Sequence, residues 1–397
     1  MKPDFNLAAT PLKPMTDRER FNATMHYQPV DRCPICDFGF WEETVPEWHK
    51  QGLPTEVEWT STAKIHTDQW FGMDSYAATN SPDVGLNPTF EWKVIEDLDD
   101  HEIVQQGDGV RVLRKKYMGS IPHHIGHLLT DRDSWREHYL PRLDPTNPAR
   151  FPADWEKRVA DWKDPNRKVP ASAWCGSLFG WLRDWMGLEN VVLVPYDDPA
   201  WFEEMVTTLA DCTIGALTVA LETGAQFDSG SMWEDMCYSG GPLLGPDHFK
   251  RFLVPHYRRI TDLLHKYGID IVWTDCDGKI DSLLPLWLDA GINCMFPIEV
   301  GTWGGDPIAY RKQYGKDLRL IGGFDKHVLQ HSKPAILAEI ERLVPLVEDG
   351  GFIPLPDHRV PPDVPYENYL YYIREVRRIW GQDTNLKPCP ALEAATV

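Results

Sequence analysis

The stretch Ile269-Asp270-Ile271-Val272-Trp273-Thr274-Asp275-Cys276-Asp277 is a short apolar run that ends in residues able to do chemistry. Four further runs in the C-terminal half have the same form, and they lie at residues 227–235, 292–299, 318–326 and 351–359. The intervals leave room for one helix each, which is typical of parallel strands joined by crossover helices. Because chemistry in α/β barrels lies at the carboxyl ends of the strands, the pattern predicts an enzyme.

The remaining segments are interpreted as additions to a single barrel. We expect an α/β protein of the TIM-type (β/α)8 barrel class, with residues 1–381 as a single domain. Residues 1–60 are expected to supply an N-terminal extension, which begins with a capping box at Thr16 and Glu19 and ends with a first strand near 33–40.

Two segments depart from the barrel pattern. Residues 90–96 and 109–114 alternate apolar and polar side chains around a glycine-containing loop, which predicts an inserted β-hairpin within residues 85–125. The proline-containing end of the chain, residues 382–397, is expected to be a mobile tail.

Composition excludes some classes of function. The 397 residues contain 60 Asp and Glu against 40 Lys and Arg, a formal net charge of −20, so nucleic acid is not an expected partner. We find no leader segment and no apolar run of membrane-spanning length, which predicts no membrane association. Eight scattered cysteines are no disulfide framework, and a cytoplasmic location is expected.

Two groups of metal-binding residue types have a plainer interpretation. Cys33 and Cys36 form a single CxxC, which without partners is at most half of a zinc site and is more typical of structural thiols. His123, His124 and His127 lie between Pro122 and Gly126, which break any helix that would align them, so pocket-lining histidines are favoured over metal ligands.

Three stretches resemble one known family. They are Trp174-Cys175-Gly176-Ser177-Leu178-Phe179 through Asp198-Pro199, then Trp233-Glu234-Asp235 with residues 245–249 and 254–257, and residues 350–358 with Pro365-Tyr366-Glu367-Asn368-Tyr369. On these residues the chain is identified as a member of the uroporphyrinogen decarboxylase superfamily. That superfamily includes the decarboxylase of haem synthesis and zinc-dependent methylcobamide:coenzyme M methyltransferases. The resemblance also implies a homodimer.

The resemblance favours the methyltransferase branch. Where uroporphyrinogen decarboxylases carry Arg-Gln-Ala-Gly-Arg for propionate groups, this chain has Asp37-Phe38-Gly39-Phe40-Trp41-Glu42-Glu43, which cannot clamp carboxylates. The family's methyltransferases hold zinc with His-x-Cys and a later Cys. Here Cys276 matches the first cysteine, Thr274 replaces the histidine, and His358 replaces the second cysteine.

The resemblance thus implies a zinc site of Cys276, His358 and a carboxylate, Glu234 or Asp275. A metal-free alternative stays open, in which Cys276 is a buried thiol and His358 an acid/base residue. Because the sequence has no Asp-x-His-x-x-Gly for binding cobalamin, any corrinoid must come with a partner protein.

Titratable side chains at the predicted strand ends are the candidate catalytic residues. They are Glu234, Asp235, Asp275, Asp277, Glu299, His358 and Arg359. Lys326 and Arg359 could bind a substrate carboxylate, while Trp174, Trp233 and Lys326 are the candidates for cofactor contacts.

Three functions are compatible with these residues. The first is methyl transfer between a small molecule and a corrinoid or thiol acceptor, with zinc activation. The second is a metal-free decarboxylase or lyase that uses the carboxylates and His358. The third is a non-catalytic binding barrel. An acidic, tryptophan-rich pocket suggests a neutral or cationic substrate, such as a methoxylated aromatic or a methylated amine.

Overall fold

The structure is a computed structural model, and it describes residues 13–79, 82–116, 121–382 and 384–395. The chain divides into two units. Unit 1 comprises residues 1–78, 168–170 and 294–397, and unit 2 comprises residues 79–167 and 171–293. Each unit has parallel strands and helices, so the predicted α/β class is confirmed.

Unit 2 is built on three parallel strands. They are β8 (Ala171–Trp174), β9 (Ser229–Trp233) and β12 (Val272–Asp275), with β9 in the middle. Between β8 and β9 the chain forms α6 (Gly180–Met186), α7 (Leu188–Asp197) and α8 (Pro199–Glu222), and between β9 and β12 it forms α9 (Pro246–Phe252) and α10 (Val254–Lys266). The predicted strands at 227–235 and 269–277 are therefore confirmed. Their almost wholly buried residues are typical of parallel strands.

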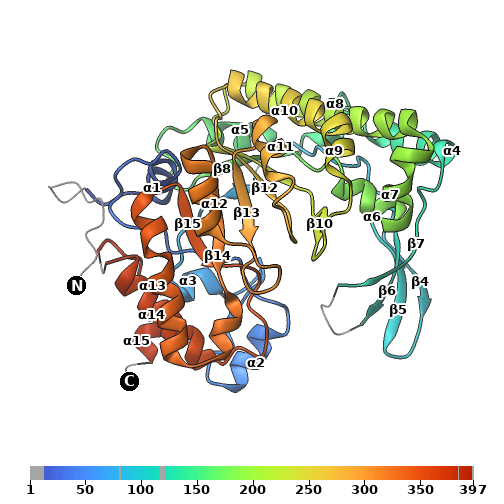
Figure 1. The fold of residues 1–397 in the computed structure, drawn as a ribbon. Helices are drawn as coiled ribbons and strands as arrows, with labels where there is room; N and C mark the ends of the chain where they lie inside the picture. Colours follow the sequence, from blue (N-terminus) through green and yellow to red (C-terminus); the bar gives the residue numbers. More distant parts are fainter. Residues whose placement is uncertain (1–12, 80–81, 117–120, 383, 396–397) are drawn as a thin grey trace. The chain divides into compact units, whose positions relative to one another are not determined.

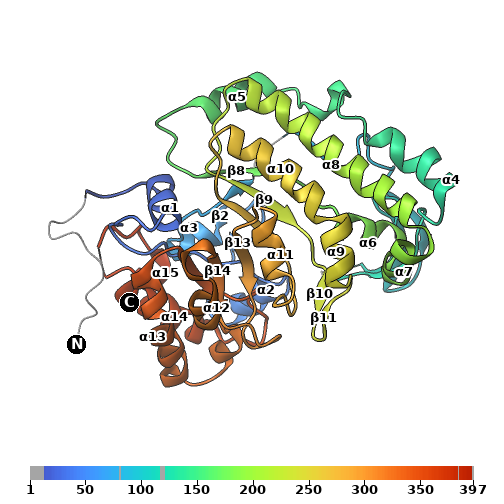
Figure 2. The same cartoon turned by 45° about the horizontal axis from the view of Figure 1, so that its top comes forward.

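Helix α8 corrects the expectation that no stretch approaches membrane-spanning length. It has 24 residues and a window apolar enough for a span, yet 56% of that window is buried inside the protein. Asp198 caps its first turn and Pro199 begins it, as expected for a helix start. Figure 2 shows α8 and α10 side by side. A core helix passes the same test of length and composition, so α8 is weak evidence for a membrane span.

The predicted hairpin is a four-stranded antiparallel sheet instead. Its strands follow chain order and are β4 (Lys93–Asp97), β5 (His101–Gln105), β6 (Arg111–Lys115) and β7 (His123–Gly126) (Figure 1). Both predicted strands exist, but each pairs with β5 rather than with the other. The sequence hid β5 because its residues His101-Glu102-Ile103-Val104-Gln105 lack strict alternation, and only Val104 is fully buried.

Unit 1 contains the other parallel strands. They are β13 (Cys294–Ile298), β14 (Arg319–Phe324) and β15 (Phe352–Pro356), with β14 in the middle. Helix α12 (Pro307–Tyr314) follows β13, α13 (Lys333–Asp349) follows β14, and α14 (Tyr366–Ile379) follows β15, with α13 and α14 packed together (Figure 1). The three remaining predicted strands are therefore confirmed.

The N-terminal segment of unit 1 packs beside β15. Helix α1 (Asp17–Met25) begins with the predicted capping box of Thr16 and Glu19. The predicted strand at 33–40 is reduced to one parallel bridge, between Phe40 and Val360. Helix α2 (Thr44–Lys50) follows this bridge.

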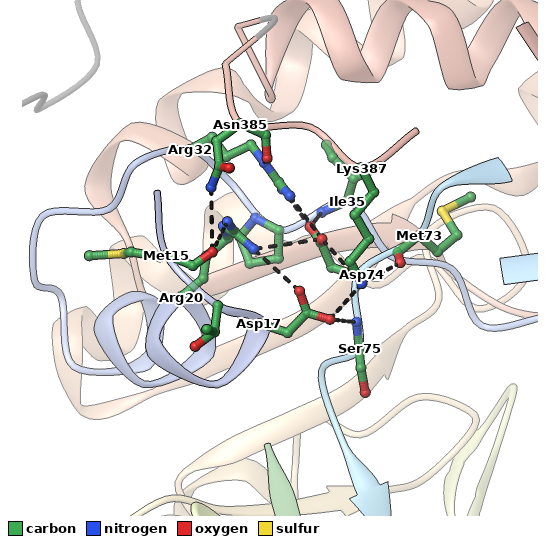
Figure 3. Close-up of polar contacts among 12 residues, drawn as sticks. Met15, Asp17, Arg20, Arg32, Ile35, Met73, Asp74, Ser75, Asn385 and Lys387 are labelled. Carbon is green, nitrogen blue, oxygen red and sulfur yellow. Dashed lines mark hydrogen bonds and ion pairs between the residues drawn. The ribbon is translucent and has the colours of Figure 1, made fainter. Parts of the chain in front are cut away.

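A network of buried ion pairs ties the two ends of the described chain together (Figure 3). Arg32 Nη2 donates to Asp74 Oδ1 at 2.8 Å, and Arg20 Nε donates to Asp31 Oδ1 at 2.9 Å. Lys387 Nζ reaches Asp17 Oδ2 at 2.6 Å. The expected mobile tail is therefore packed within residues 384–395, where α15 (Pro390–Ala394) also contacts α3 (Thr67–Phe71). The composition of this segment did not reveal its packing, because the residues that anchor it lie far away in sequence.

The remaining elements are short. Unit 1 also contains β1 (Val57–Glu58), β2 (Ile65–His66) and the 3-10 turns Gly315–Asp317 and Lys326–Gln330. Before β8, unit 2 also contains α4 (Arg132–Ser134), a π-turn (Trp135–Tyr139), the 3-10 turns Leu140–Arg142 and Pro148–Arg150, and α5 (Trp155–Lys163). After β9, it also contains β10 (Cys237–Tyr238), β11 (Gly241–Pro242) and α11 (Leu284–Asp289). Strand β3 (Ala78–Thr79) lies at the boundary of the units.

Candidate functional site

Three predicted carboxylates meet at the carboxyl ends of β9 and β12 in unit 2. Asp235, Asp275 and Asp277 place one oxygen each so that all three lie within 4.8 Å of one another. Strand register explains the meeting, because Trp233 of β9 lies opposite Asp275 of β12 and each chain continues past its strand end. The Asp277 N–H donates to Asp235 Oδ1 at 3.2 Å. We call these three residues the carboxylate trio.

Within the trio, Asp235 is unusual in its backbone conformation and its electrostatics. Asp235 has φ +38°, in the left-handed region that side-chain-bearing residues rarely adopt. Burial, and secondly the charge of Asp277, raise the pKa of Asp235 to about 6. A carboxyl group with such a pKa is partly protonated near neutral pH, so it can act as an acid or as a base.

The two predicted tryptophans lie beside the trio at neighbouring strand ends. Trp174 ends β8 and Trp233 ends β9, and both are half-buried. The guanidinium carbon of Arg183 lies 5.1 Å from the ring centre of Trp233, a cation–π contact. The same guanidinium donates to the backbone oxygen of Asp235. Arg183 was not among the predicted site residues, because nothing in its local sequence shows this approach.

Glu234 has a different role from the predicted one. It is fully buried, and Oε2 accepts the N–H groups of Phe179 at 2.9 Å and Gly180 at 3.1 Å, while Oε1 accepts that of Leu178 at 2.9 Å. The Ser177 hydroxyl also donates to Oε2 at 3.0 Å. With both oxygens occupied, Glu234 anchors the start of α6, and it does not fit a metal ligand or an acid/base residue.

Cys276 is likewise not a member of the carboxylate trio. Its thiol is 2% exposed, and Sγ accepts the Met236 N–H at 3.4 Å. Burial, and secondly the neighbouring Cys237 thiol, raise the pKa of Cys276 well above its usual value. Asp275 and Asp277 are half-buried, whereas Cys276 between them is buried. Within the described residues, Cys276 is not in the group of side chains that lie close enough to share a metal ion.

In unit 1, Lys326 is enclosed by carboxylates. Its Nζ lies 3.6 Å from Glu299 Oε1 and 3.7 Å from Asp357 Oδ1, with the lysine side chain only 10% exposed. Asp357 is completely buried and accepts the N–H groups of Val300 and Gly301, so it holds the loop after β13. Lys326 and Glu299 thus neutralise each other. The predicted role of Lys326 in binding a substrate carboxylate or cofactor does not fit this pairing.

His358 and Arg359 lie among aromatic rings of unit 1. The His358 ring stacks on Trp41 with 5.5 Å between centres and meets the edge of Phe38 at 5.0 Å. The Arg359 guanidinium carbon lies 5.5 Å from the Trp41 ring centre and 5.0 Å from that of Trp59. The sequence did not single out either tryptophan as a site residue, since both lie more than 290 positions before Arg359.

Trp41 and Trp59 border a cavity of about 550 Å³. Its other lining residues are Glu42, Val45, Pro46, His49, Glu58 and Thr60. We call it the tryptophan cavity. Its volume is in the range of small-molecule sites.

The other predicted metal candidates do not assemble. Cys33 and Cys36 are both buried, and burial raises the pKa of each thiol. His123 and His124 lie in β7, a strand and not the expected loop, while His127 Nδ1 lies 3.0 Å from the Asp184 carbonyl oxygen. Within the described residues, the carboxylate trio is the one group of three or more ligand side chains that are close enough to share a metal ion.

Comparisons with known proteins agree on one family. Residues 157–379 match the model of the uroporphyrinogen decarboxylase (URO-D) family. The uroporphyrinogen decarboxylases of Trichormus variabilis and Nostoc punctiforme are each 24% identical over 184 residues, which cover 46% of this chain and 50% and 49% of theirs. The chain thus spans about half the length of these curated relatives.

A solved structure resembles the chain over a longer region. A methyltransferase from Methanosarcina mazei has a TM-score of 0.58 and 15% identity, and the match covers 91% of this chain and 98% of that one. At this identity the similarity is one of fold.

Proposed function

The chain belongs to the uroporphyrinogen decarboxylase family, and from this premise we propose that it is a methyltransferase. It would move a methyl group between a small-molecule substrate and a corrinoid on a partner protein, or a thiol acceptor. The observation that carries the proposal is the carboxylate trio at the strand ends, where α/β barrels do their chemistry. Asp37–Glu43 at the place of the family's propionate-binding stretch, and the fold similarity to a methyltransferase, support it further.

The barrel itself is part of the proposal. Each unit has three parallel strands that are followed by helices, and Phe40 bridges Val360 just beyond β15. These features support a (β/α)8 barrel with an N-terminal extension.

The trio is the proposed metal site. Of the predicted zinc ligands, Glu234 already accepts three backbone N–H groups, and Cys276 is not in the described group of side chains close enough to share an ion. Asp235, Asp275 and Asp277 would hold a divalent cation such as zinc through three carboxylate oxygens, which leaves positions for substrate. When bound, the ion supplies Lewis-acid activation of a thiol, hydroxyl or methoxy oxygen.

The protein's own residues have defined tasks in this proposal. The Asp277 N–H orients Asp235 by donating to its Oδ1. Trp174 and Trp233 end the neighbouring strands β8 and β9 and would exclude water from one side of the ion. Glu234 holds the loop that places α6.

Elemental analysis after purification without chelator or affinity tag tests the metal site. We expect about one zinc or other divalent ion per chain in the wild type and in Cys276→Ala, and none in Asp235→Asn or Asp275→Asn. Loss of metal in Cys276→Ala, with retention in both aspartate variants, would contradict the trio. Methyl transfer to a corrinoid or thiol is then followed by mass spectrometry of both products.

A second candidate is a metal-free decarboxylase or lyase. The pKa of Asp235, raised to about 6, favours it because such a residue can donate a proton near neutral pH. A wild-type protein that stays metal-free after zinc is supplied, yet releases CO2 from an acid substrate, would establish this function. A folded wild type that binds ligands but turns over neither substrate class would favour the non-catalytic barrel.

Homodimerisation and a cytoplasmic location remain predictions. Light scattering of the purified full chain would test the first, and cell fractionation the second.

A further inference from the structure

Arg183 of α6 reaches the carboxylate trio through the backbone of Asp235. Its guanidinium donates to the Asp235 carbonyl oxygen, and the guanidinium carbon lies 5.1 Å from the ring centre of Trp233. Nε and Nη2 donate to Asp184 Oδ1 at 3.2 Å and 3.1 Å. The arginine side chain is only 22% exposed. Three partners therefore fix the guanidinium at the carboxyl end of β9.

Asp235 is the member of the trio whose backbone most needs support. Its φ of +38° lies in the left-handed region, which costs free energy for a residue with a side chain. Its N–H is 3.5 Å from the Asp275 carbonyl oxygen, which is a weak hydrogen bond. The bond from Arg183 to the Asp235 carbonyl oxygen adds a charged donor on the other side of the residue. A fixed conformation of Asp235 thus depends on Arg183.

Helix α6 gives Arg183 a firm base. The carboxylate of Glu234 accepts N–H groups at the start of the helix, at 2.9 Å from Phe179 and 3.1 Å from Gly180. A Cβ added to Gly180 would lie 2.8 Å from the backbone oxygen of Glu234, so the helix packs directly against the end of β9. The Arg183 N–H donates to the Phe179 carbonyl at 2.9 Å, within the first turn. Consecutive residues, Glu234 and Asp235, are therefore both tied to α6.

The charge of Arg183 could have the opposite effect, because a cation near the trio repels a metal ion. Asp184 opposes this repulsion, since its carboxylate pairs with the same guanidinium. The two charges nearly cancel at a distance, and solvent and salt weaken what is left. Residues that orient a metal ligand typically change metal affinity about 10–100-fold. The orienting effect should therefore outweigh the repulsion.

We infer that Arg183 is a positioning residue of the carboxylate trio. By holding the Asp235 carbonyl, it keeps the carboxylate of Asp235 beside those of Asp275 and Asp277 and so strengthens the binding of a divalent cation. The inference rests on the proposed function, whose metal site it extends to a residue that acts through the backbone. It assigns no step of the reaction to Arg183.

Metal titration of the full chain, after treatment with chelator and its removal, tests this role. Calorimetry measures the affinity for zinc, and the visible absorption of bound cobalt(II) reports the geometry of the ligands. We expect Arg183→Met to bind either ion about 10–100-fold more weakly than the wild type and to change the cobalt spectrum. Arg183→Lys should lie between the two, because it keeps a charged donor but loses the planar fork.

A matched control separates positioning from general stability. Arg132→Met removes another partly buried arginine of unit 2, which pairs with Asp198 at 2.7 Å, and should keep the wild-type affinity and spectrum. Near-ultraviolet circular dichroism checks that each variant is folded. A merely structural role of Arg183 would lower stability and leave the affinity and spectrum of the folded protein unchanged. If Arg183→Met does not fold, the comparison of Arg183→Lys with the wild type decides the question.

Two results would overturn the role of Arg183 alone. They are unchanged metal affinity in the folded arginine variants, and tighter binding in Arg183→Met, which would show that repulsion dominates. A wild type that binds neither ion would refute the metal site of the proposed function, and the role of Arg183 with it. The titration contains no methyl donor or acceptor, so Arg183-dependent metal binding without methyl transfer would refute the methyltransferase function alone.

Discussion

The carboxylate of Glu234 accepts the N–H of Phe179 at 2.9 Å, and this contact ties the end of β9 to the start of α6. Two more backbone N–H groups and one hydroxyl bind the same carboxylate. Glu234→Ala would leave these buried donors unpaired, at a cost of roughly 1–3 kcal/mol for each donor that water does not reach.

We therefore expect Glu234→Ala to lower the free energy of unfolding by at least about 3 kcal/mol in urea titrations, from the loss of several such bonds. Glu189→Ala, exposed on α7, is the control and should change it little. A metal ligand would behave differently, because its loss would matter only when metal is present. Equal stability of wild type and Glu234→Ala in chelator would refute the anchoring role.

Removing the charge of Asp277 should change the titration of Asp235. The pKa of Asp235 is raised to about 6 by burial and by that charge, so Asp277→Asn should lower it toward its ordinary value. Carbon-13 NMR titration of the carboxyl groups measures the shift directly. Asp270→Asn, exposed at the other end of β12, is the control. An unchanged pKa in Asp277→Asn would show that burial alone sets it.

The raised pKa of Asp37 should make the free energy of unfolding decrease as pH rises from about 4 to 7. Tyr369 donates its hydroxyl to Asp37 Oδ2 at 2.9 Å, while burial and the charge of Asp68 raise the pKa of Asp37 to about 7. Between about pH 4 and 7 the folded state therefore holds a proton that the unfolded state has released. The contribution is complete below pH 4 and is lost as pH approaches 7, with a slope of at most about 1.4 kcal/mol per pH unit.

Urea titrations across this pH range, compared between wild type and Asp37→Asn, isolate that contribution. The variant keeps an acceptor for Tyr369 but cannot ionise, so its stability should fall less steeply. Parallel curves for the two proteins would show that Asp37 has an ordinary pKa.

Breaking the ion pair of Arg32 and Asp74 should be costly (Figure 3). Their side chains are 2% and 1% exposed, so Arg32→Met leaves a buried charge with weaker partners and should cost about 3–5 kcal/mol. The double variant Arg32→Met/Asp74→Leu should recover part of this loss. Lys157→Met, from the exposed pair with Asp161, is the matched control and should have little effect. A double variant as unstable as the sum of its singles would contradict a direct pair.

Substitution of Gly39 should destabilise the protein when Trp59 is present. Its φ is +98°, and a Cβ would lie 2.2 Å from the Trp59 ring, so Gly39→Ala must both strain the backbone and displace the indole. We expect a loss of at least about 1–2 kcal/mol from the backbone term alone. In a Trp59→Ala background the same change should cost less. Equal costs in both backgrounds would show that the two residues do not press on each other.

Much of the parallel fold could be predicted because its signals are local. The runs at 227–235, 269–277, 292–299, 318–326 and 351–359 are apolar over the length of a strand and separated by a helix, so the period of the pattern reveals each element. Strand β5 escaped prediction because a small antiparallel sheet with one exposed face buries few side chains. The packing of the C-terminal segment was not predicted because Lys387 donates to Asp17, which lies 370 positions away in sequence.

By itself the sequence determined the α/β class, the order of the parallel strands and the enrichment of their ends in titratable residues. It could not determine which of those residues face the same way. Only tertiary structure decided that Asp235, Asp275 and Asp277 meet while Glu234 and Cys276 lie buried behind them, and that Arg359 stands between Trp41 and Trp59. The physical reason is that strand identity follows from local hydrophobic periodicity, whereas the role of a charged side chain depends on its burial and its partners, which are set by segments distant in sequence.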